Sequence, residues 1–438
     1  MVKKREIKIR RNLNADELYR LLHVSFSHIK EHRLGGIKIS LPDALMSGFA
    51  LFSLKDSSLL AFDEREPENL KTIYGLESIP CDTQMRTILD GVEPETLRPS
   101  FQLIFRELQR GKVLEPYSYL SGHYLLSIDG TGYFSSHKIH CENCLEKTLK
   151  NGETLYHHQM LGAAIVHPDL SEVIPLMPEP IMKQDGENKN DCERNASKRF
   201  LEKFRQDHPH LKMIVIEDAL SSNAPHIREL QRHNLRFILG VKESDHKHLF
   251  KQVAQARESG TSTLYETTEK GVTRRYHFVN KVPLNASNQD LLVNFIEYWE
   301  ISDKGEKYFA WVTDMTITCL NCYDIMRGGR ARWKIENETY NTLKNQGYHF
   351  EHNFGHGDKN LAVVFPLLMM LAFLVDQALQ IACPLFQAAL TKLRSRTRLW
   401  ERVRNLFASI RFDSMEMLFR AIFYGYHIEN IVILDNTT

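Results

Sequence analysis

The chain has 438 residues, of which 42% are hydrophobic and 25% are charged, and its formal net charge is +1. This balance predicts a folded protein of two or three domains, and it excludes both a largely disordered chain and a uniformly basic one. The seven cysteines, an odd number without a secretion signal, argue against a disulfide framework. The N-terminal residues lack the apolar core of a signal peptide, so we expect a cytoplasmic protein.

Charge is unevenly distributed along the chain. Residues 1–40 carry ten Lys or Arg against four Asp or Glu, and residues 391–420 carry eight against three. Such clusters can neutralise DNA phosphates even when the total charge is near zero, although a solvated surface remains the alternative for each. The second cluster includes Arg394, Arg396, Arg398, Arg402 and Arg404.

The first 119 residues have the pattern of short helices. Asn14 begins a capped helix, a second helical run covers residues 41–54, and Asp82 follows a proline as a third helix start. Short helices behind a basic N-terminal arm suit a domain that recognises DNA ends, and a plain helical domain is the alternative.

Residues 120–259 alternate between strand and helix patterns, which indicates a mixed α/β order. We predict strands at 124–129, 160–167, 171–176, 212–218 and 236–241, and helices at 191–204 and 222–234.

After residue 259 the predicted secondary structure changes twice. Residues 260–318 are rich in strand patterns, and the rest is helical nearly to the end. The longest apolar run, residues 361–375, is shorter than the roughly 20 residues that a membrane helix needs, and it contains Pro366. We therefore expect a buried helix there and no membrane partner.

Three acids stand at positions that suit metal-ion chemistry. Asp129 and Asp218 end two predicted strands, and Glu336 lies in a helix predicted over residues 330–344. Strand-end acids can meet at one edge of a sheet, and a helix packed there can add a third. Their oxygens suit Mg²⁺ or Mn²⁺, and two such ions can activate an attacking oxygen and stabilise a leaving one. Singly, each acid could be a turn or cap residue, and Glu338 competes with Glu336.

Five segments resemble the catalytic blocks of bacterial insertion-sequence transposases with a DDE triad. They are Ser127-Ile-Asp-Gly-Thr131, Asn190-Asp-Cys-Glu-Arg-Asn-Ala196, Val215-Ile-Glu-Asp218, Arg332-Trp-Lys-Ile-Glu336 and Phe350-Glu-His-Asn-Phe-Gly-His-Gly357. The resemblance covers residues 120–380. The acids are separated by 89 and 118 residues, and the long second interval matches the subgroup whose ribonuclease H-like core carries a β-rich insertion before the glutamate.

The resemblance implies an α+β fold in five parts. These are a helical domain for DNA-end recognition (1–119), the first part of a ribonuclease H-like mixed-sheet core (120–259), a β-rich insertion (260–318), the second part of the core with the glutamate helix (319–384) and a helical C-terminal region (385–438).

The resemblance also implies a function, that of a transposase which cuts and joins transposon-end DNA with two Mg²⁺ or Mn²⁺ ions. Asp129 would ligate both ions, and Asp218 and Glu336 one each. The implied partners are double-stranded DNA with terminal inverted repeats, target DNA and a second copy of the chain, at the bacterial nucleoid. Another ribonuclease H-like nuclease, such as a junction resolvase, and a catalytically inactive DNA-binding derivative are the alternatives.

The family has a signature around the glutamate, with a Tyr, two residues, an Arg, three residues, the Glu, six residues and a Lys. Arg332 matches it, whereas Gly329 stands at the Tyr position and Leu343 at the Lys position, with Lys344 next along the chain. Arg332 and Lys344 are therefore the candidate DNA-phosphate ligands. An intrahelical pair with Glu336 is the alternative for Arg332.

Several Cys, His and Trp residues offer further candidates. The two Cys-x-x-Cys pairs could bind zinc, either both pairs together or the first pair with the nearby histidines. The alternative is that they are buried free thiols. For the later histidines DNA-backbone contacts or loop hydrogen bonds fit better than a metal. The tryptophans could stack on an unpaired base or pack in the core. The cysteine pairs are Cys141 with Cys144 and Cys319 with Cys322, and the histidines near the first pair are His137 and His140. The later histidines are His349, His352 and His356, and the tryptophans are Trp299 and Trp311.

Overall fold

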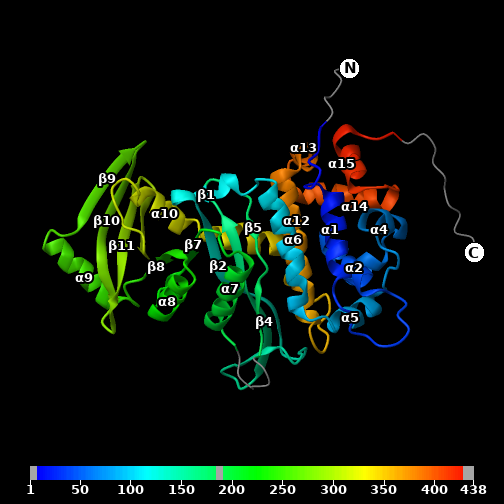
Figure 1. Cartoon of the computed structure of the whole chain (residues 1–438), viewed down its shortest axis with the longest axis horizontal. Coiled ribbons are helices and arrows are strands. Elements are labelled where there is room, and N and C mark those ends of the chain that lie inside the picture. The colour runs from blue at the N-terminus through cyan, green and yellow to red at the C-terminus, as the bar shows by residue number, and fades with distance from the viewer. Residues whose placement is uncertain (1–6, 184–190, 428–438) are drawn as a thin grey trace, which may run out of the picture. The chain divides into compact units, whose positions relative to one another are not determined.

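The computed structural model describes residues 7–183 and 191–427. The chain forms two compact units. The helical unit comprises Met1–Val113, Gln346–His349 and Leu371–Thr438, and the sheet unit comprises Leu114–Asn345 and Phe350–Met370. Figure 1 shows the elements of both. Lys3, Lys4 and Arg5 of the basic arm, Asn190, and the end of the predicted C-terminal region lie outside the described residues.

The helical unit is built from short amphipathic helices with well-formed caps. The Asn14 side chain accepts a hydrogen bond from the Glu17 amide at 3.0 Å, and the predicted start at Asp82 is the first residue of α5. The helices are α1 (Ala15–Ser27), α2 (Leu41–Ser53), α3 (Leu59–Asp63), α4 (Pro67–Tyr74), α5 (Asp82–Asp90), α6 (Arg98–Arg110), α13 (Pro384–Leu393), α14 (Arg396–Ser409) and α15 (Met415–Tyr424).

A buried ion pair lies in the core of the helical unit. Lys55 Nζ is 2.5 Å from Asp376 Oδ2, and the Tyr348 hydroxyl donates to the same carboxylate oxygen. Burial lowers the pKa of Lys55 to about 8, against the opposing attraction of Asp376. The two opposite charges thus compensate each other's loss of hydration in the buried core.

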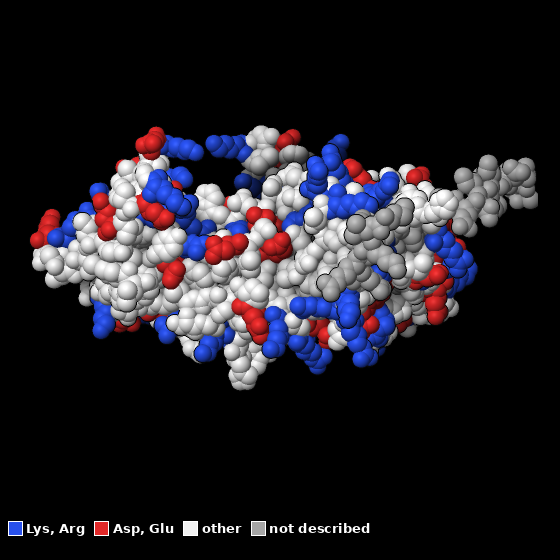
Figure 2. All heavy atoms as spheres, turned by 90° about the horizontal axis from the view of Figure 1, so that it is seen from above, with Lys and Arg blue, Asp and Glu red and all other residues white. Residues whose placement is uncertain are grey.

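Some of the C-terminal arginines bind the helical unit itself. Arg404 donates to the backbone carbonyls of Leu54 and Lys55, and Arg396 donates to Gln346 Oε1 at 3.4 Å. Their proposed contact with DNA stays a prediction. On the face shown in Figure 2 basic and acidic side chains occur together.

The sheet unit contains a mixed sheet of twelve strands among the described residues. They are β1 (Ser118–Tyr119), β2 (His123–Ser136), β3 (Leu145–Thr148), β4 (Thr154–Val166), β5 (Ile174–Pro175), β6 (Glu179–Ile181), β7 (Met213–Glu217), β8 (Arg236–Gly240), β9 (Thr263–Glu269), β10 (Val272–Asn285), β11 (Asn288–Ser302) and β12 (Gly305–Thr313). The helices are α7 (Glu193–Asp207), α8 (Ala224–Arg232), α9 (Lys247–Glu258), α10 (Cys322–Arg330), α11 (Asn341–Asn345) and the start of α12 (Leu361–Ala382).

Strand β2 organises the sheet. It pairs antiparallel with β4 on one side and parallel with β7 on the other, and β7 pairs parallel with β8. All five residues of β7 are buried, as expected for a central parallel strand. The strands of the predicted 260–318 segment continue the same sheet, because β12 pairs antiparallel with β8 and is followed by β11, β10 and β9. The fold is therefore mixed α+β with a large sheet and flanking helices.

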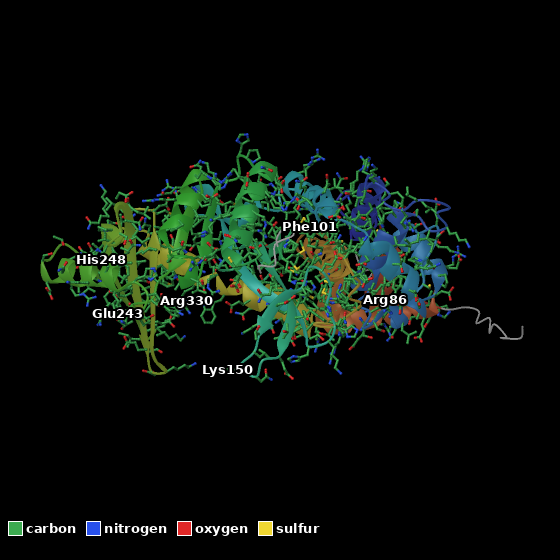
Figure 3. The ribbon with its side chains drawn as sticks, turned by 90° about the horizontal axis from the view of Figure 1, so that it is seen from below. Arg86, Phe101, Lys150, Glu243, His248 and Arg330 are labelled. Atoms are coloured by element: carbon green, nitrogen blue, oxygen red, sulfur yellow. The ribbon has the colours of Figure 1, made fainter. Side chains whose placement is uncertain are left out.

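The predicted elements differ from the observed ones in several places, and β1, β3 and β6 were not predicted. Strands β2 and β4 extend into a long antiparallel pair, and the β3–β4 turn carries Lys150 at its tip (Figure 3). Only Ile174–Pro175 of the strand predicted at 171–176 pairs in the sheet. Helix α9 was not predicted. The helix predicted at 330–344 is interrupted, because α10 ends at Arg330 and a π-helical turn covers Ile335–Tyr340.

Helix α12 fills part of the core, as predicted for its apolar run. It is long and apolar enough to cross a membrane by length and composition, but its most apolar stretch is entirely buried. This is the pattern of a core helix. Pro366 lies inside the helix, in its second turn, where it has no N–H to donate to the carbonyl one turn earlier.

Candidate active site

Asp129 lies in β2, and Asp218 directly follows β7, the strand that pairs with β2. In the parallel pair β2–β7, Ser127 pairs with Ile216, an offset of 89 residues. The two acids are separated by the same 89 residues, so they lie at one level of neighbouring strands, whose usual spacing is about 4.8 Å. Asp218 follows the end of its strand as predicted, but Asp129 lies within β2, which continues to Ser136, so the prediction that Asp129 ends a strand is wrong.

Glu336 reaches this place on the π-helical turn, which packs across β2 and β4. Two hydrogen bonds fix the segment. The Ser127 hydroxyl donates to the Arg332 carbonyl at 2.9 Å, and the Tyr340 hydroxyl donates to the Asp129 carbonyl at 2.5 Å. Turns of this kind are rare and occur often at functional sites, because the extra residue redirects the side chains around it.

Two glycines make this close packing possible. A Cβ atom on Gly162 of β4 would lie 2.3 Å from the Tyr340 hydroxyl oxygen, and one on Gly130 would lie 2.3 Å from a carboxylate oxygen of Glu193. Both contacts are far inside van der Waals distance. The glycine after Asp129 thus leaves space for a further acid that the sequence analysis did not single out.

The electrostatics tie these acids into one cluster. Burial raises the pKa of Asp129 to about 7, the Arg332 guanidinium opposes this rise, and the carboxylates of Glu336, Asp218 and Glu193 add to it. A carboxyl group that is half-ionised near neutral pH, next to other acids, is a common property of functional sites.

Glu193 is the residue that the sequence analysis missed. It lies in the first turn of α7, and burial together with the Asp218 and Glu217 carboxylates raises its pKa. The available signal was the block Asn190-Asp-Cys-Glu-Arg-Asn-Ala196, which carried part of the family resemblance without a role.

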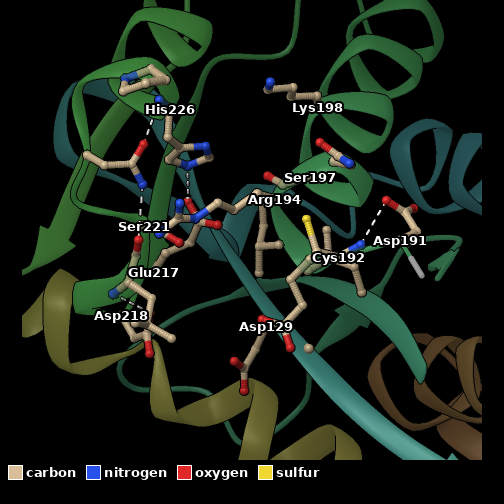
Figure 4. A pocket seen from close by; sticks show the side chains of 18 of the residues that line it. Asp129, Asp191, Cys192, Arg194, Ser197, Lys198, Glu217, Asp218, Ser221 and His226 are labelled. Atoms are coloured by element: carbon tan, nitrogen blue, oxygen red, sulfur yellow. Dashed lines mark hydrogen bonds and ion pairs between the residues drawn. The ribbon is translucent and has the colours of Figure 1, made fainter. Parts of the chain in front are cut away.

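The cluster borders a cavity of about 800 Å³. Figure 4 shows Asp129 on one side of the cavity and Asp218 with Glu217 on another. Glu217 accepts from the His226 ring nitrogen at 2.5 Å, and this carboxylate raises the pKa of His226 although burial alone would lower it. The wall also carries Arg194 and Lys198, and Glu336 is not among its residues.

The three predicted acids do not converge at ligand distance. Asp218 Oδ1 accepts from the Leu220 amide at 2.9 Å, and Glu336 Oε1 lies 2.6 Å from Arg332 Nη1. Among the residues that the structure describes, only a Cys/His group elsewhere in the unit has its ligand atoms within 4.8 Å of one another. Because like charges repel, Asp218 and Glu336 bind these other partners and not one another. The donor set itself, all carboxylate oxygens, fits a hard divalent cation.

The departures from the family signature have physical reasons. A side chain at Gly329 would lie 2.5 Å from the Trp311 indole nitrogen, so Trp311 occupies the space of the missing Tyr. Leu343 is fully buried, where a Lys would lose its hydration. Lys344 is paired with Glu351 at 2.7 Å. The role of Arg332 and Lys344 in DNA binding stays a prediction.

The remaining candidates are dispersed. The structure does not join the two Cys-x-x-Cys pairs, because the second pair, with exposed Cys319 and buried Cys322, lies outside the Cys/His group. His137 and His140 lie outside it too. His140 stacks on Tyr156.

The later histidines also separate. His352 packs against Phe354, and His349 belongs to the helical unit, whereas His356 joins the Cys/His group. Trp311 is buried, and Trp299 packs against Tyr308 at 5.3 Å between ring centres.

Comparison with known proteins finds similarity among solved structures only. No protein-family model and no curated protein matches the chain. Among solved structures, the chain is similar to the cryo-EM structure of a piggyBac transposase synaptic complex with hairpin DNA. The TM-score is 0.43 with 10% sequence identity, over 98% of this chain and 90% of that chain. At this TM-score and identity the similarity establishes neither a fold family nor a function, so both have to be argued from the residues.

Proposed function

We propose that the chain is a DNA transposase that cuts and joins phosphodiester bonds at the level of Asp129 and Asp218. The observation that carries the proposal is the sheet register, which relates β2 and β7 by the same 89 residues that separate the two acids, while the turn with Glu336 packs across β2 and β4. The order and spacing of the acids, and their resemblance to insertion-sequence transposases, support the same assignment.

The strand arrangement supports a ribonuclease H-like core. Strand β2 has an antiparallel neighbour on one side, and the parallel strands β7 and β8 lie on the other. The long segment between Asp218 and Glu336 contains β9 to β12, as expected for the subgroup with a β-rich insertion.

Asp129, Asp218 and Glu336 would hold two Mg²⁺ or Mn²⁺ ions. Such ions, when bound, activate the attacking oxygen and stabilise the leaving one. Asp129 supplies a carboxylate whose proton is lost near neutral pH, since its pKa is about 7. The Arg332 guanidinium compensates the charge of Glu336, and the Tyr340 hydroxyl fixes the backbone of Asp129.

The proposed partners are DNA duplexes with terminal inverted repeats, target DNA and a second copy of the chain. A dimer would keep both ends of an element together during joining. Arg332 and Lys344 would contact phosphates, and the reaction would take place on DNA in the bacterial cytoplasm.

A cleavage and strand-transfer assay tests the proposal. It uses duplexes carrying the repeats that flank the gene, with Mg²⁺ or Mn²⁺, and compares the parent with Asp129→Ala. Glu336→Gln and Glu338→Gln form a matched pair, because they remove the same charge two residues apart on one turn.

We expect metal-dependent cutting and joining that Asp129→Ala and Glu336→Gln lose, while DNA binding and the Glu338→Gln variant are retained. Cutting without joining would indicate a nuclease of another kind. DNA binding without cutting in any of the proteins would contradict catalysis and leave a DNA-binding derivative.

A further inference from the structure

Four metal-binding side chains meet at a second place in the sheet unit, formed by Cys141, Cys144, His158 and His356. His158 Nε2 lies 3.3 Å from both sulfur atoms, and His356 Nε2 lies 3.3 Å from the sulfur of Cys144. The two sulfur atoms are 3.9 Å apart. All four ligand atoms lie within 4.8 Å of one another.

These distances match the edges of a tetrahedral site. With Zn–S bonds of about 2.3 Å and Zn–N bonds of about 2.0–2.1 Å, neighbouring ligands in a tetrahedron are separated by roughly 3.3–3.8 Å. We propose that these four residues bind one Zn²⁺ ion in a structural site. Two thiolates with two imidazoles in this arrangement favour zinc over the hard cations that the carboxylate cluster suits.

The burial of the four residues supports a structural role. All four are buried, and together they supply the four ligands that a closed tetrahedral site needs. Aromatic rings enclose it, since Phe134 lies 4.4 Å from the His356 ring and Tyr133 stacks on the His158 ring. Catalytic zinc sites keep one position open, whereas structural sites are closed by four protein ligands.

The ligands come from three segments that are distant in sequence. The cysteines lie in the loop after β2, His158 lies in β4, and His356 lies in the loop before α12. Hydrogen bonds already join the first and third segments, from the Glu142 amide to the Asp358 carbonyl and from the Asn143 side chain to the Lys359 carbonyl.

A zinc ion would fasten these segments at one point. Strands β2 and β4 are also the strands on which the turn with Glu336 packs, and the His356 loop follows that turn in sequence. Zinc would therefore stabilise the same strands that support the carboxylate cluster. The site is independent of the proposed chemistry, because it uses none of the three acids.

Metal analysis of the whole purified chain tests the proposal. We expect close to one zinc per chain after loosely bound metal has been removed with a weak chelator. Cys144→Ser should lose it. Cys322→Ser is the matched control, because Cys322 is also the buried second cysteine of a Cys-x-x-Cys pair but lies outside the cluster, and it should keep the zinc.

A second measurement on the parent protects the test against a variant that fails to fold. Co²⁺ replacing zinc should give the intense visible bands of a tetrahedral site with thiolate ligands, and the Cys322→Ser protein should give the same spectrum. A parent without zinc and without these bands, a parent that holds iron, or a disulfide between Cys141 and Cys144 in the purified protein would each overturn the proposal.

Discussion

Replacing Asp129 with Asn should stabilise the metal-free protein. Burial raises the pKa of Asp129 from 3.8 to about 7, with Arg332 opposing the rise and Glu336 and Asp218 adding to it. Above neutral pH the folded state must therefore hold a carboxylate where it is disfavoured. Asn keeps the shape of the side chain and removes the charge, so the folded state no longer carries this cost.

The size of the effect follows from the shift. The change from 3.8 to about 7 is roughly three pKa units, which would be worth at most about 4 kcal/mol. Because the side chain is partly exposed, solvent screening reduces this to about 1–2 kcal/mol. In a domain of this size, that corresponds to a rise of roughly 2–6 °C in melting temperature.

The pH dependence has a fixed sign. The folded pKa lies above the unfolded one, so the parent is most stable below the unfolded value and loses stability as the pH rises through the folded value, becoming flat above it. The advantage of Asp129→Asn should therefore be full at pH 8 and smaller at pH 5.

Thermal unfolding in EDTA at the two pH values measures the effect, followed by addition of Mg²⁺ at pH 8. Mg²⁺ should stabilise the parent more than Asp129→Asn. Asp303→Asn, at an exposed position between β11 and β12, is the control and should change little. An Asp129→Asn protein no more stable than the parent at pH 8, or with an equal gain at both pH values, would refute the reasoning.

Three further substitutions test the packing. Gly162→Ala should displace the Tyr340 hydroxyl and reduce the cleavage rate by about tenfold or more. Adding Tyr340→Phe should restore part of the cleavage rate. A Gly162→Ala protein that cleaves at the parental rate would contradict the close packing of Tyr340 on Gly162. Lys55→Met should cost about 3–5 kcal/mol of unfolding free energy in denaturant titrations, because Asp376 is left buried and unpaired. The double replacement with Asp376→Leu should recover most of that loss, and a single variant of parental stability would contradict it. Leu343→Lys puts a Lys where the family signature has one. It should cost about 3 kcal/mol or more of unfolding free energy in the same titration, because the side chain at this position is fully buried. A stable, active variant would show that the position can open.

The sequence predicts the strands of the core well where apolar runs are short and end in acids. Strand β7 is an example, because five buried residues followed by Asp218 leave few other interpretations. The pairing of strands is a different matter. The equality between the 89-residue offset of β2 and β7 and the separation of Asp129 and Asp218 becomes meaningful only once the register is known.

The parts that could not be predicted depend on contacts between distant segments. Glu193 lies with the other acids because the first turn of α7 packs against Gly130. No local sequence pattern predicts this contact. The partners of Cys141 and Cys144 are His158, on a strand, and His356, more than two hundred residues later. The π-helical turn arises from packing on β2 and β4, whereas helical periodicity alone predicted an unbroken helix.

Arg332 connects the two roles that its sequence position suggested. Its guanidinium pairs with Glu336 and opposes the rise that burial causes in the pKa of Asp129, so in this structure it compensates charge within the acid cluster. Its Nη1 hydrogen bond to Glu336 holds the guanidinium in place, and a DNA phosphate that took the same N–H would have to displace the carboxylate. Once divalent cations neutralise the acids, the cost of releasing it falls, so we expect the pair and the phosphate contact to be successive states. Arg332→Gln should then weaken DNA binding several-fold more with Mg²⁺ than with EDTA, as measured by fluorescence anisotropy. Equal weakening under both conditions would show that the phosphate contact does not depend on the acids.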